Sequence, residues 1–309
     1  MPKVSVIIPT HNRAALLRRA IASVLRQSFQ DFEIVIIDDA SDDDTRAAIA
    51  SQTDVRIRYF RNARNRGEAV SRNAGVAHAT GEYIAFLDDD DTWLPEKLET
   101  QVRLLDRCPA KVGAVYCGYD RVDMESGATV ATIPPARRGA IYADLREQNW
   151  VGSPSTVILR RECLAKAGPF DEQLTFGIDY DMWIRISRFY DFEFVNEPLV
   201  RYSVHAQRLS ADTRTILRGK EAQLEKYADY FAGDPRSYSR YLLSLGVLYC
   251  YNRRPAEGRA ALRRAIRVYP FEFRPYVNLF FSLWGCDNFI RMKSFRDRLQ
   301  RPFSGAARH

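Results

Sequence analysis

Alternation of apolar strands and amphipathic helices in the first 94 residues constrains the fold more than any other feature of this sequence. Unbroken β-branched runs, such as residues 4–9 and 32–38, are typical of strands buried on both faces of a sheet. Between them, apolar residues recur at helical spacing, as in residues 17–25. This alternation predicts parallel β-α-β units with right-handed crossovers. The expected strands are 4–9, 32–38, 57–60 and 83–87, and the expected helices are 17–25, 45–50, 68–79 and 95–108.

Local signals refine this prediction and extend it to the rest of the chain. Asn12 is the expected N-cap of the first helix, and Ser41 with Asp44 forms a sequence typical of a capping box for the second. Past residue 94 the pattern indicates a mixed sheet. Its expected elements are strands 112–119, 157–159, 192–195 and 199–205, a surface hairpin or loop at 127–139, and a helix at 179–189.

After about residue 209 the composition becomes helical and basic. The small residues Gly246, Gly258 and Ala265 and the closing Pro270 have the offsets of one tetratricopeptide-like helix pair. We therefore expect an α/β domain at 1–212 and an α-helical C-terminal region at 213–309 that contacts a substrate, a membrane or another subunit. The expected helices are 219–231, 240–251, 256–268 and 274–284.

Composition indicates a folded protein with a large core. Of the 309 residues, 46% are hydrophobic and 28% are charged, which suits one large domain with an appendage. The apolar run at the N-terminus is too short for a signal peptide, and the run at 277–286 is about half of a bilayer span. The five cysteines are scattered and odd in number, which predicts reduced thiols and a cytoplasmic location: Cys108, Cys117, Cys163, Cys250 and Cys286.

Four consecutive aspartates, Asp88 to Asp91, directly follow the expected strand 83–87. At an effective dielectric of about 20, two like charges about 4 Å apart repel by about 4 kcal/mol. A divalent cation removes much of that cost, and Mg²⁺ prefers one or two carboxylates together with phosphate oxygens. The alternative is a solvated acidic turn that caps the next helix. An EF-hand is disfavoured, because the aspartate clusters lack the glycine and terminal glutamate of that calcium loop.

Polar residues also follow the first two strands, at the edge where parallel α/β sheets bind ligands. The first strand ends in Pro9, Thr10, His11 and Asn12. These groups can line a base pocket, with His11 flat against the ring, although a lone loop histidine is often structural. Asp39 ends the second strand, where a carboxylate can accept hydrogen bonds from a base imide or from ribose hydroxyls. Helix capping is the alternative for the acidic residues there, and it leaves Asp39 unassigned.

Three further segments place charged side chains toward the same edge. Arg72 lies on helix 68–79, where a guanidinium can reach a nucleotide or a diphosphate, and a solvated arginine is the alternative. Asp179 and Asp181 open helix 179–189. Because a helix cap needs only one carboxylate, the other can accept a proton from an incoming hydroxyl. His205 ends the last expected strand and can face a metal or a diphosphate.

Taken together, these segments resemble the inverting family 2 glycosyltransferases of the GT-A fold. The resemblance implies a Rossmann-like α/β fold, with a mostly parallel sheet covered by helices on both faces, and here a C-terminal α-helical appendage follows. It covers about two-thirds of the chain, and the ordered set is far more specific than any one segment. The segments are VSVIIPTHNR (4–13), IVIIDDASDDDT (34–45), NRGEAVSRNAGVAHATGEYIAFLDDDDTW (65–93) and FDEQLTFGIDYDMWIR (170–185).

The resemblance also implies roles by position. Residues 9–12 and Asp39 would hold the nucleobase, with Asp39 reading a uracil imide, and Arg72 would support the nucleotide. In the acidic run, Asp88 and Asp89 would lie near the ribose and diphosphate, and Asp90 would bind Mg²⁺ or Mn²⁺. Asp179 would be the general base that deprotonates the acceptor hydroxyl. Asp181 and Trp183 would shape the acceptor side, and His205 would lie near the metal and the diphosphate.

Two departures from the family pattern keep alternatives open. The family commonly has a Glu-Asp pair at the base position, whereas Ile178 precedes Asp179 here, which leaves room for Asp181 as the base. The acidic run also has an extra aspartate, so the metal ligand can shift by one residue. Inverting transfer needs a base on one face of the sugar and stabilisation of the leaving group on the other. Asp179 and the metal at Asp90 would supply these two functions.

Net charge and the competing functions complete the sequence-based picture. The net charge of +7 suits anionic partners, but the arginines form no RNA-binding motif, so nucleic acid is not an expected partner. A sugar-nucleotidyltransferase would need a glycine-rich loop after the first strand, which residues 10–13 lack.

The resemblance implies a UDP-sugar donor, a glycan or lipid-linked acceptor and a role in surface polysaccharide synthesis. The basic aromatic tail predicts peripheral attachment to the inner face of the cell membrane, or else a helical bundle with a solvated basic face.

Overall fold

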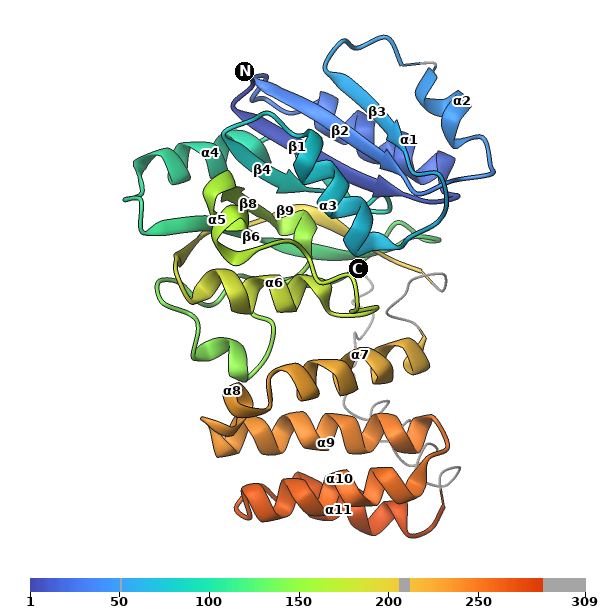
Figure 1. Cartoon of the computed structure of the whole chain (residues 1–309), viewed down its shortest axis with the longest axis vertical. Coiled ribbons are helices and arrows are strands. Elements are labelled where there is room, and N and C mark those ends of the chain that lie inside the picture. The colour runs from blue at the N-terminus through green and yellow to red at the C-terminus, as the bar shows by residue number, and fades with distance from the viewer. Residues whose placement is uncertain (51, 206–211, 286–309) are drawn as a thin grey trace, which may run out of the picture. The chain divides into compact units, whose positions relative to one another are not determined.

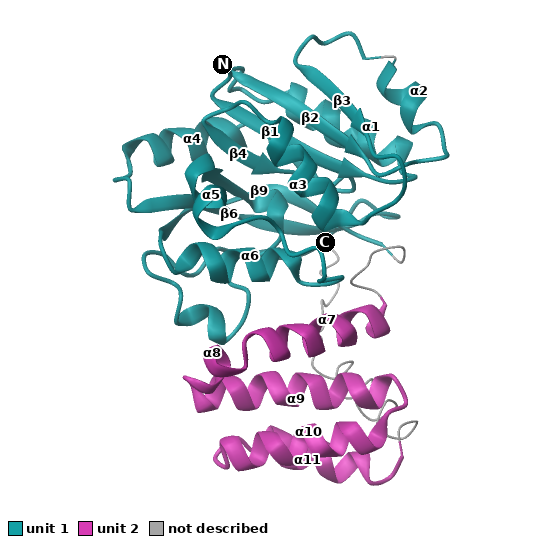
Figure 2. Cartoon of the chain, in the orientation of Figure 1, with its two compact units in different colours: residues 1–208 teal, residues 209–309 magenta. Residues whose placement is uncertain are grey.

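The computed structural model describes residues 1–50, 52–205 and 212–285. The chain divides into two compact units, residues 1–208 and 209–309 (Figure 2). This division lies four residues before the expected boundary between residues 212 and 213. Below, the two units are called the sheet unit and the helical unit, and each is described by itself.

The sheet unit contains the elements that the first part of the sequence predicts (Figure 1). Its strands are β1 (Val4–Thr10), β2 (Phe32–Asp38), β3 (Ile57–Arg61), β4 (Tyr83–Phe86), β5 (Thr92–Trp93), β6 (Val112–Asp123), β7 (Thr129–Ile133), β8 (Val157–Arg160) and β9 (Asp191–Val204). Its α-helices are α1 (Ala14–Leu25), α2 (Thr45–Ala50), α3 (Glu68–His78), α4 (Lys97–Arg107), α5 (Arg161–Ala167) and α6 (Ile178–Ser187). Two short 3-10 helices, Asp144–Arg146 and Pro154–Thr156, lie in the connection between β7 and β8.

Within the described residues, nine strands form one sheet in the order β3-β2-β1-β4-β8-β6-β9-β5, with β7 paired to β6. The four strands predicted from the N-terminal third are parallel to one another. Strand β8 is antiparallel to both of its neighbours, β4 and β6, whereas β6 and β9 are parallel. The predicted fold class is therefore confirmed: the sheet is rich in parallel pairs in its first half and mixed in its second.

Helices cover both faces of this sheet. The apolar residues of α1 and α4 form one continuous core with alternate residues of the central strands, including Val6, Ile8 and Ile34. Helix α3 packs on the opposite face, in front of the sheet in Figure 1. There Gly75 lies against Ile7 and Ile37 so closely that a Cβ atom would collide with the Ile7 side chain. A small residue on α3 thus sets its distance from β1 and β2.

The helical unit contains α7 (Thr213–Lys226), α8 (Ala228–Ala232), α9 (Pro235–Tyr251), α10 (Pro255–Val268) and α11 (Arg274–Ser282). Helices α9 and α10 form the predicted pair, and their closest approach is at Gly246 and Gly258. A Cβ atom on Gly246 would lie 2.7 Å from Cγ of Leu262, and one on Gly258 would lie 2.8 Å from Sγ of Cys250. The tetratricopeptide-like spacing therefore corresponds to a real helix contact.

Several local predictions need correction. The residue preceding α1 is Arg13, and its side chain makes no cap hydrogen bond, so Asn12 is not the N-cap. Instead the backbone N–H of Asn12 donates to Oγ of Ser41, and Oδ1 of Asn12 accepts from the backbone of Asp42. These side chains join two loops because the strands before them are neighbours. The two strands predicted at 192–195 and 199–205 are one strand, β9, of 14 residues.

Among the described residues, all four cysteines are free thiols: Cys108, Cys117, Cys163 and Cys250. The fifth, Cys286, lies outside the described residues. A search of the described part of the chain found no helix with the length and apolar character that crossing a membrane requires.

Candidate active site

The candidate site begins where the parallel strands β1, β2 and β4 end. In the register of β1 and β2, Thr10 is paired with Asp38, so these two strands end side by side. The backbone N–H of Asp39 then donates to the carbonyl oxygen of Thr10, 2.8 Å away. Polar residues separated by about thirty positions in the sequence therefore meet at one edge of the sheet, as predicted.

The four aspartates after β4 each have hydrogen-bond or ion-pair partners, which offset part of their mutual repulsion. Oδ1 of Asp88 accepts from Nη2 of Arg72 at 2.6 Å, and its Oδ2 accepts from the hydroxyl of Ser153 at 3.2 Å. The backbone N–H of Asp88 donates to Oγ of Ser155. Asp91 is buried and accepts from the backbone N–H of Ser203. Asp91 thus links the acidic run to β9 through one carboxylate oxygen, while its Oδ2 is buried and has no hydrogen-bond partner among the described residues.

Asp89 and Asp90 share one arginine. Nη1 of Arg13 lies 3.0 Å from Oδ1 of Asp89 and 3.2 Å from Oδ2 of Asp90. The buried Asp89 also accepts from the hydroxyl of Thr10 at 2.7 Å. Burial raises the pKa of Asp89 to about 6, with Arg13 opposing the shift and the Asp90 charge adding to it. Nε2 of His205 lies 3.0 Å from Oδ2 of Asp90.

The residues around Asp90 fit a divalent cation that takes part of its ligand shell from a substrate. A search of the described residues finds no group of three or more His, Cys, Asp or Glu side chains placed to hold a metal. A carboxylate and an imidazole do meet there, since Asp90 and His205 are in contact. Mg²⁺ commonly binds through one or two carboxylates and completes its shell with phosphate oxygens and water. The donor atoms are therefore of the right kind for Mg²⁺ or Mn²⁺ bound together with a diphosphate.

Asp39 holds the loop that leads to α3. Its carboxylate accepts from the backbone N–H groups of Arg66 and Gly67 and from the side-chain amide of Asn62, all within 3.0 Å. Helix α3 begins at the next residue, Glu68. The side chain predicted to read a base therefore also fixes the start of the helix that carries Arg72.

The other predicted base-pocket residues line the same edge. Pro9 and Thr10 are buried in β1, while His11 is half-buried and Asn12 is exposed. Nδ1 of His11 is buried, and no hydrogen-bond partner for it occurs in the part of the chain that the structure describes. Asn12 has a left-handed backbone (φ 54°), which turns the chain from β1 toward α1. His11 is thus the residue of this segment with an unused polar atom.

Arg72 connects the acidic run with the opposite side of the site. It is almost fully buried, and its Nη2 contacts both Glu68 and Asp88. Burial raises the pKa of Glu68 to about 7, with Arg72 opposing the shift and the charges of Asp88 and Asp179 adding to it. Considering only described residues, Nε and Nη1 of Arg72 are buried without a hydrogen-bond partner. Two guanidinium nitrogens, with three N–H groups, are therefore left for an anionic ligand.

Asp179 lies in the first turn of α6 and close to this arginine. Burial raises the pKa of the Asp179 carboxyl, while its backbone hydrogen bond and Arg72 oppose the shift and the Asp88 charge adds to it. Its Oδ2 accepts from Nδ2 of Asn149 at 3.1 Å. The structure thus brings a carboxyl group with a raised pKa to the side of Arg72 and Asp88, from a segment ninety residues further along the chain.

Asp181 and Trp183 lie elsewhere. Both side chains are fully buried, and Asp181 forms an ion pair of 2.7 Å with Arg185, one helical turn further on. Arg185 in turn donates to the carbonyl oxygens of Ala167 and Gly168. The indole N–H of Trp183 donates to the carbonyl oxygen of Gly152 at 3.3 Å. In this structure neither side chain presents a surface to an acceptor, and the geometry favours Asp179 over Asp181 as the base.

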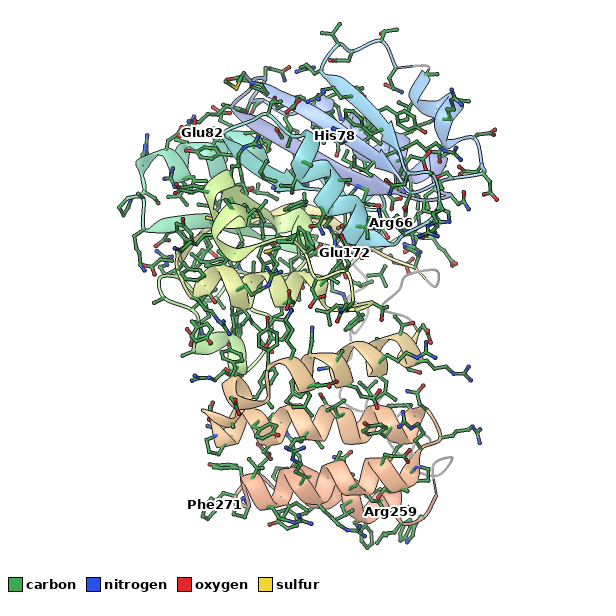
Figure 3. The ribbon with its side chains drawn as sticks, viewed as in Figure 1. Arg66, His78, Glu82, Glu172, Arg259 and Phe271 are labelled. Atoms are coloured by element: carbon green, nitrogen blue, oxygen red, sulfur yellow. The ribbon has the colours of Figure 1, made fainter. Side chains whose placement is uncertain are left out.

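Two loops meet at the rim of the site. Arg66 precedes α3, Glu172 precedes α6, and their side chains lie 3.7 Å apart as an exposed ion pair. Figure 3 shows the two residues beside one another. Nearby, the side chain of Asn73 on α3 exchanges hydrogen bonds with the backbone of Phe170. These contacts tie the segment that carries Asp179 to the helix that carries Arg72.

The structure adds residues that the sequence analysis did not single out. Arg13 follows the predicted residues 9–12 directly, so its position was a usable signal. Glu68 lies four residues before Arg72, a spacing typical of a helical ion pair. Asn149, Ser153 and Ser155 lie in the long connection between β7 and β8, where neither periodicity nor a motif indicates function.

Comparison with known proteins places the chain in a family. The family model described as Glycosyl transferase family 2 matches residues 5–168, which is more than half of the chain. The chain belongs to glycosyltransferase family 2. One relative is the Escherichia coli protein named UDP-Glc:alpha-D-GlcNAc-diphosphoundecaprenol beta-1,3-glucosyltransferase WfgD. It is 30% identical over 248 residues, which are 79% of this chain and 92% of the relative. The predicted family and the enzyme class, a glycosyltransferase, are thereby confirmed.

Solved structures show the same fold. S. aureus TarS 1-349 in complex with UDP-GlcNAc superposes with a TM-score of 0.62 over 96% of this chain and 92% of that chain, at 18% identity. The mannosyltransferase PcManGT from Pyrobaculum calidifontis, in complex with GDP-Man and Mn²⁺, has a TM-score of 0.61 over 97% of this chain and 81% of that chain, at 19% identity. The family 2 chain described here therefore has the GT-A type of fold.

Proposed function

We propose that this family 2 glycosyltransferase moves a sugar from a UDP-sugar, with inversion and metal assistance, to a hydroxyl of a glycan or lipid-linked acceptor. The observation that carries the proposal is that Arg72 pairs with Asp88 of the acidic run and is close enough to Asp179 for their charges to interact. Inverting transfer needs a base on one side of the anomeric carbon and compensation of the departing charge on the other. Both kinds of group lie within one site here.

Residues from three strand ends would hold the donor. The unused N–H groups of Arg72 suit an anionic diphosphate, and the buried Nδ1 of His11 is available to a base or ribose. The family relative WfgD is named for a UDP-glucose donor, and the structural neighbour TarS was solved with UDP-GlcNAc. These names support uridine as the base, with Asp39 as the group that reads it.

Asp179 would act as the general base. A carboxylate that loses some of its preference for the charged form becomes a stronger proton acceptor, and burial does this to Asp179. In its ionised form it would take the proton of the acceptor hydroxyl as that oxygen attacks the anomeric carbon. Arg72 would remain paired with Asp88 and Glu68 and keep the positive charge beside the departing diphosphate.

Asp90 and His205 would hold Mg²⁺ or Mn²⁺. When bound, such a cation supplies positive charge that neutralises the diphosphate as the sugar leaves. Arg13 already compensates part of the charge of Asp89 and Asp90, and it would keep both carboxylates oriented toward the same point. The structural neighbour PcManGT was solved with Mn²⁺, which supports a divalent metal in this fold.

We also propose that the acceptor is carried by a lipid and that the enzyme takes part in surface polysaccharide synthesis at the inner face of the cell membrane. The name of WfgD includes a diphosphoundecaprenol acceptor. The charge of this chain is consistent with work at an anionic surface. Residues 253–309 carry 13 basic and 4 acidic residues, a formal charge of +9, so residues 1–252 contribute −2 to the net +7.

Calorimetric binding of UDP, with and without Mn²⁺, to the wild type and to Asp90→Ala tests the donor site. We expect metal-dependent binding that Asp90→Ala reduces at least tenfold, because the cation loses its protein carboxylate. Asp54→Ala is the matched control, since Asp54 lies outside the site and forms an ion pair with Arg56, two residues further on. Absence of UDP binding under both conditions would refute the uridine assignment, and GDP and dTDP would then show whether only the base is wrong.

A further inference from the structure

Helix α11 exposes aromatic side chains to solvent. The residues that it buries fully within the helical unit are Pro275, Asn278 and Ser282, which are small or polar, and Phe281 packs partly buried beside them. Its aromatic residues Tyr276 and Phe280 are exposed to solvent, with 44% and 53% of their surface accessible. A helix that packs in a protein and faces water normally shows the opposite arrangement. The outer face of α11 is therefore built to meet an apolar medium.

The exposed apolar residues continue on both sides of α11. Phe271 and Phe273 lie just before the helix, with 86% and 68% of their surface accessible. Trp284 follows it, is 55% exposed, and has its ring centroid 5.1 Å from that of Phe280. Figure 3 shows Phe271 projecting from the helical unit near one end of the α10–α11 layer. Exposed apolar residues that gather in one short segment in this way mark an interaction site.

The preceding helix, α10, carries exposed arginines. On α10, Arg263 and Arg267 are exposed and lie one helical turn apart, on the side away from the buried Gly258, Leu262 and Ala265. Residues 253–285 carry seven arginines and two acidic residues. Positive charge of this density would repel a second copy of the same surface, whereas it is complementary to anionic lipid.

We propose that these residues form a docking surface for an anionic lipid bilayer. The α10–α11 surface is defined here by Phe271, Phe273, Phe280 and Trp284 together with Arg263 and Arg267. The aromatic rings would enter the interface between headgroups and acyl chains, and the arginines would lie among the phosphates. The biological role of this surface depends on the proposed function, in which the acceptor is carried by a lipid. The evidence for the surface itself comes from the helical unit.

Co-sedimentation of the full chain with vesicles tests the surface. We expect binding to vesicles of phosphatidylglycerol and phosphatidylcholine in equal amounts, and little binding to phosphatidylcholine alone. The double variant Phe271→Ser/Phe273→Ser is expected to bind at least tenfold more weakly. Its matched control is Val55→Ser/Val130→Ser, which removes two other exposed apolar side chains, 96% and 56% accessible, from the sheet unit.

A charge variant tests the second part of the surface. Arg263→Gln/Arg267→Gln is expected to bind the anionic vesicles about thirtyfold more weakly, since each arginine near such a surface contributes about fivefold. Arg18→Gln/Arg19→Gln, which removes two exposed arginines of α1, is the control and should bind as the wild type does.

Three outcomes would overturn the docking surface: a wild type that does not bind the anionic vesicles, controls that lose as much binding as the test variants, or an aromatic variant that abolishes self-association in sedimentation velocity without changing lipid binding. UDP binding by the same variants separates this failure from failure of the proposed function. The surface variants should bind UDP normally whether or not they bind lipid.

A second, independent observation concerns Asn149. Its Oδ1 accepts from the backbone N–H groups of Val151 and Gly152, and its Nδ2 donates to the carbonyl oxygen of Gly152 and to Oδ2 of Asp179. All four distances lie between 3.0 and 3.2 Å. Because both ends of the amide are used, its orientation is fixed by the network. One N–H group is thus held rigidly against the carboxylate.

We infer that Asn149 is a positioning residue that holds the Asp179 carboxylate in its productive orientation. This inference rests on the proposed role of Asp179. The side chain does not reach the reacting atoms itself, and it acts by donating to one oxygen so that the other can face the acceptor hydroxyl. The loop that carries it is fixed in turn by Trp183, whose indole N–H donates to Gly152.

The variant Asn149→Asp isolates this contact, because it keeps the oxygen that accepts from Val151 and Gly152 and replaces only the donor. We expect kcat to fall at least tenfold with little change in KM, and the acid limb of the pH–rate profile to move to higher pH. A carboxylate beside Asp179 would favour the protonated form of that residue. Gln148→Glu, which adds a charge at the exposed neighbouring position, is the matched control and should behave as wild type.

An unchanged acid limb in Asn149→Asp would overturn the inference, and a lowered melting temperature with that unchanged limb would show a purely structural role. Failure of the proposed function is distinguishable, because it would appear as substantial transfer activity in Asp179→Asn, whatever Asn149→Asp does.

Discussion

The acidic edge of the sheet unit and the last helix of the helical unit both contain side chains that are unusual for their surroundings. At the edge of the sheet, charged groups such as Asp89 and Arg72 are buried, and each of the first three aspartates of the acidic run has a partner of opposite charge or a hydrogen-bond donor. On α11, aromatic groups are exposed and their outer faces are uncovered by described residues. The sheet unit thus contains buried charges at the place where a small polar substrate would react. The helical unit has exposed apolar side chains at the place where a larger partner would dock.

This difference predicts different responses to substitution. In the sheet unit, removing one charged atom leaves another buried charge without compensation, so effects should be large and local. In the helical unit, exposed side chains contribute independently, so effects should be graded and additive. The experiments below test that contrast, from the largest expected effect to the smallest.

Replacing Asp179 by Asn should cause the largest loss of activity. The variant keeps the size of the side chain and removes its ability to take a proton. We expect kcat for sugar transfer to fall about 10² to 10⁴-fold, the usual contribution of a positioned base. The affinity for UDP, measured by calorimetry, should remain within about threefold of wild type, because Asp179 is not among the residues proposed to bind the donor.

The pH dependence of the wild type supplies the control for that experiment. Burial raises the pKa of Asp179, so the base should become protonated, and activity should fall, at a pH above the ordinary aspartate value of about 3.9. The acid limb should be absent from the residual activity of Asp179→Asn. An acid limb at an unshifted aspartate pKa, or one that survives in the variant, would contradict the assignment of the base.

Replacing Asp181 by Asn should affect stability more than catalysis. The substitution leaves the Arg185 guanidinium, beside a fully buried position, without its negative partner. Breaking a buried ion pair lowers the free energy of unfolding by about 3 to 5 kcal/mol. We expect the free energy of unfolding, measured with urea, to fall by about 3 kcal/mol, while kcat of the folded enzyme changes by less than about threefold. A variant as inactive as Asp179→Asn but fully stable would show that Asp181 is the base after all.

Two glycine substitutions compare the units directly. Gly75→Ala should force α3 away from Ile7, and overpacking of this kind costs about 1 to 3 kcal/mol. Gly258→Ala should cost less, about 1 kcal/mol, because the higher helix propensity of alanine offsets part of the clash with Cys250. Calorimetry should show each substitution lowering the transition of its own unit. A single transition shifted by both variants would mean that the units unfold together.

Much of the fold could be predicted because strands buried on both faces are nearly continuous apolar runs. Strand β2 has the predicted bounds, and β1 differs by one residue at its end. The cap predicted at Asn12 was wrong for a physical reason. Its side chain has the right chemistry for a cap, but the neighbouring strand brings Ser41 and Asp42 within reach, and those tertiary partners take its hydrogen bonds.

The candidate site was less predictable where chemistry alone could not choose between residues. Asp179 and Asp181 are the same residue type and lie two positions apart, so they project from different sides of α6. The arginine four residues after Asp181 was the available signal, since this spacing favours an ion pair within a helix. Asn149 had no such signal, because it lies in an irregular loop and its contact with Asp179 exists only after folding.

Strand β9 determines the shortest segment of this chain that contains both the complete sheet and the candidate site. The segment matched by the family model ends at residue 168, but β9 lies between β6 and β5 within the sheet, and α6 with Asp179 also follows that point. A cut at residue 168 would leave the β9-facing edge of β6 unpaired, remove the partner of the terminal strand β5 and discard the proposed base. Chimaeras that exchange the helical unit between relatives should therefore be joined after His205, where the last strand has been completed and the acidic edge still retains its imidazole.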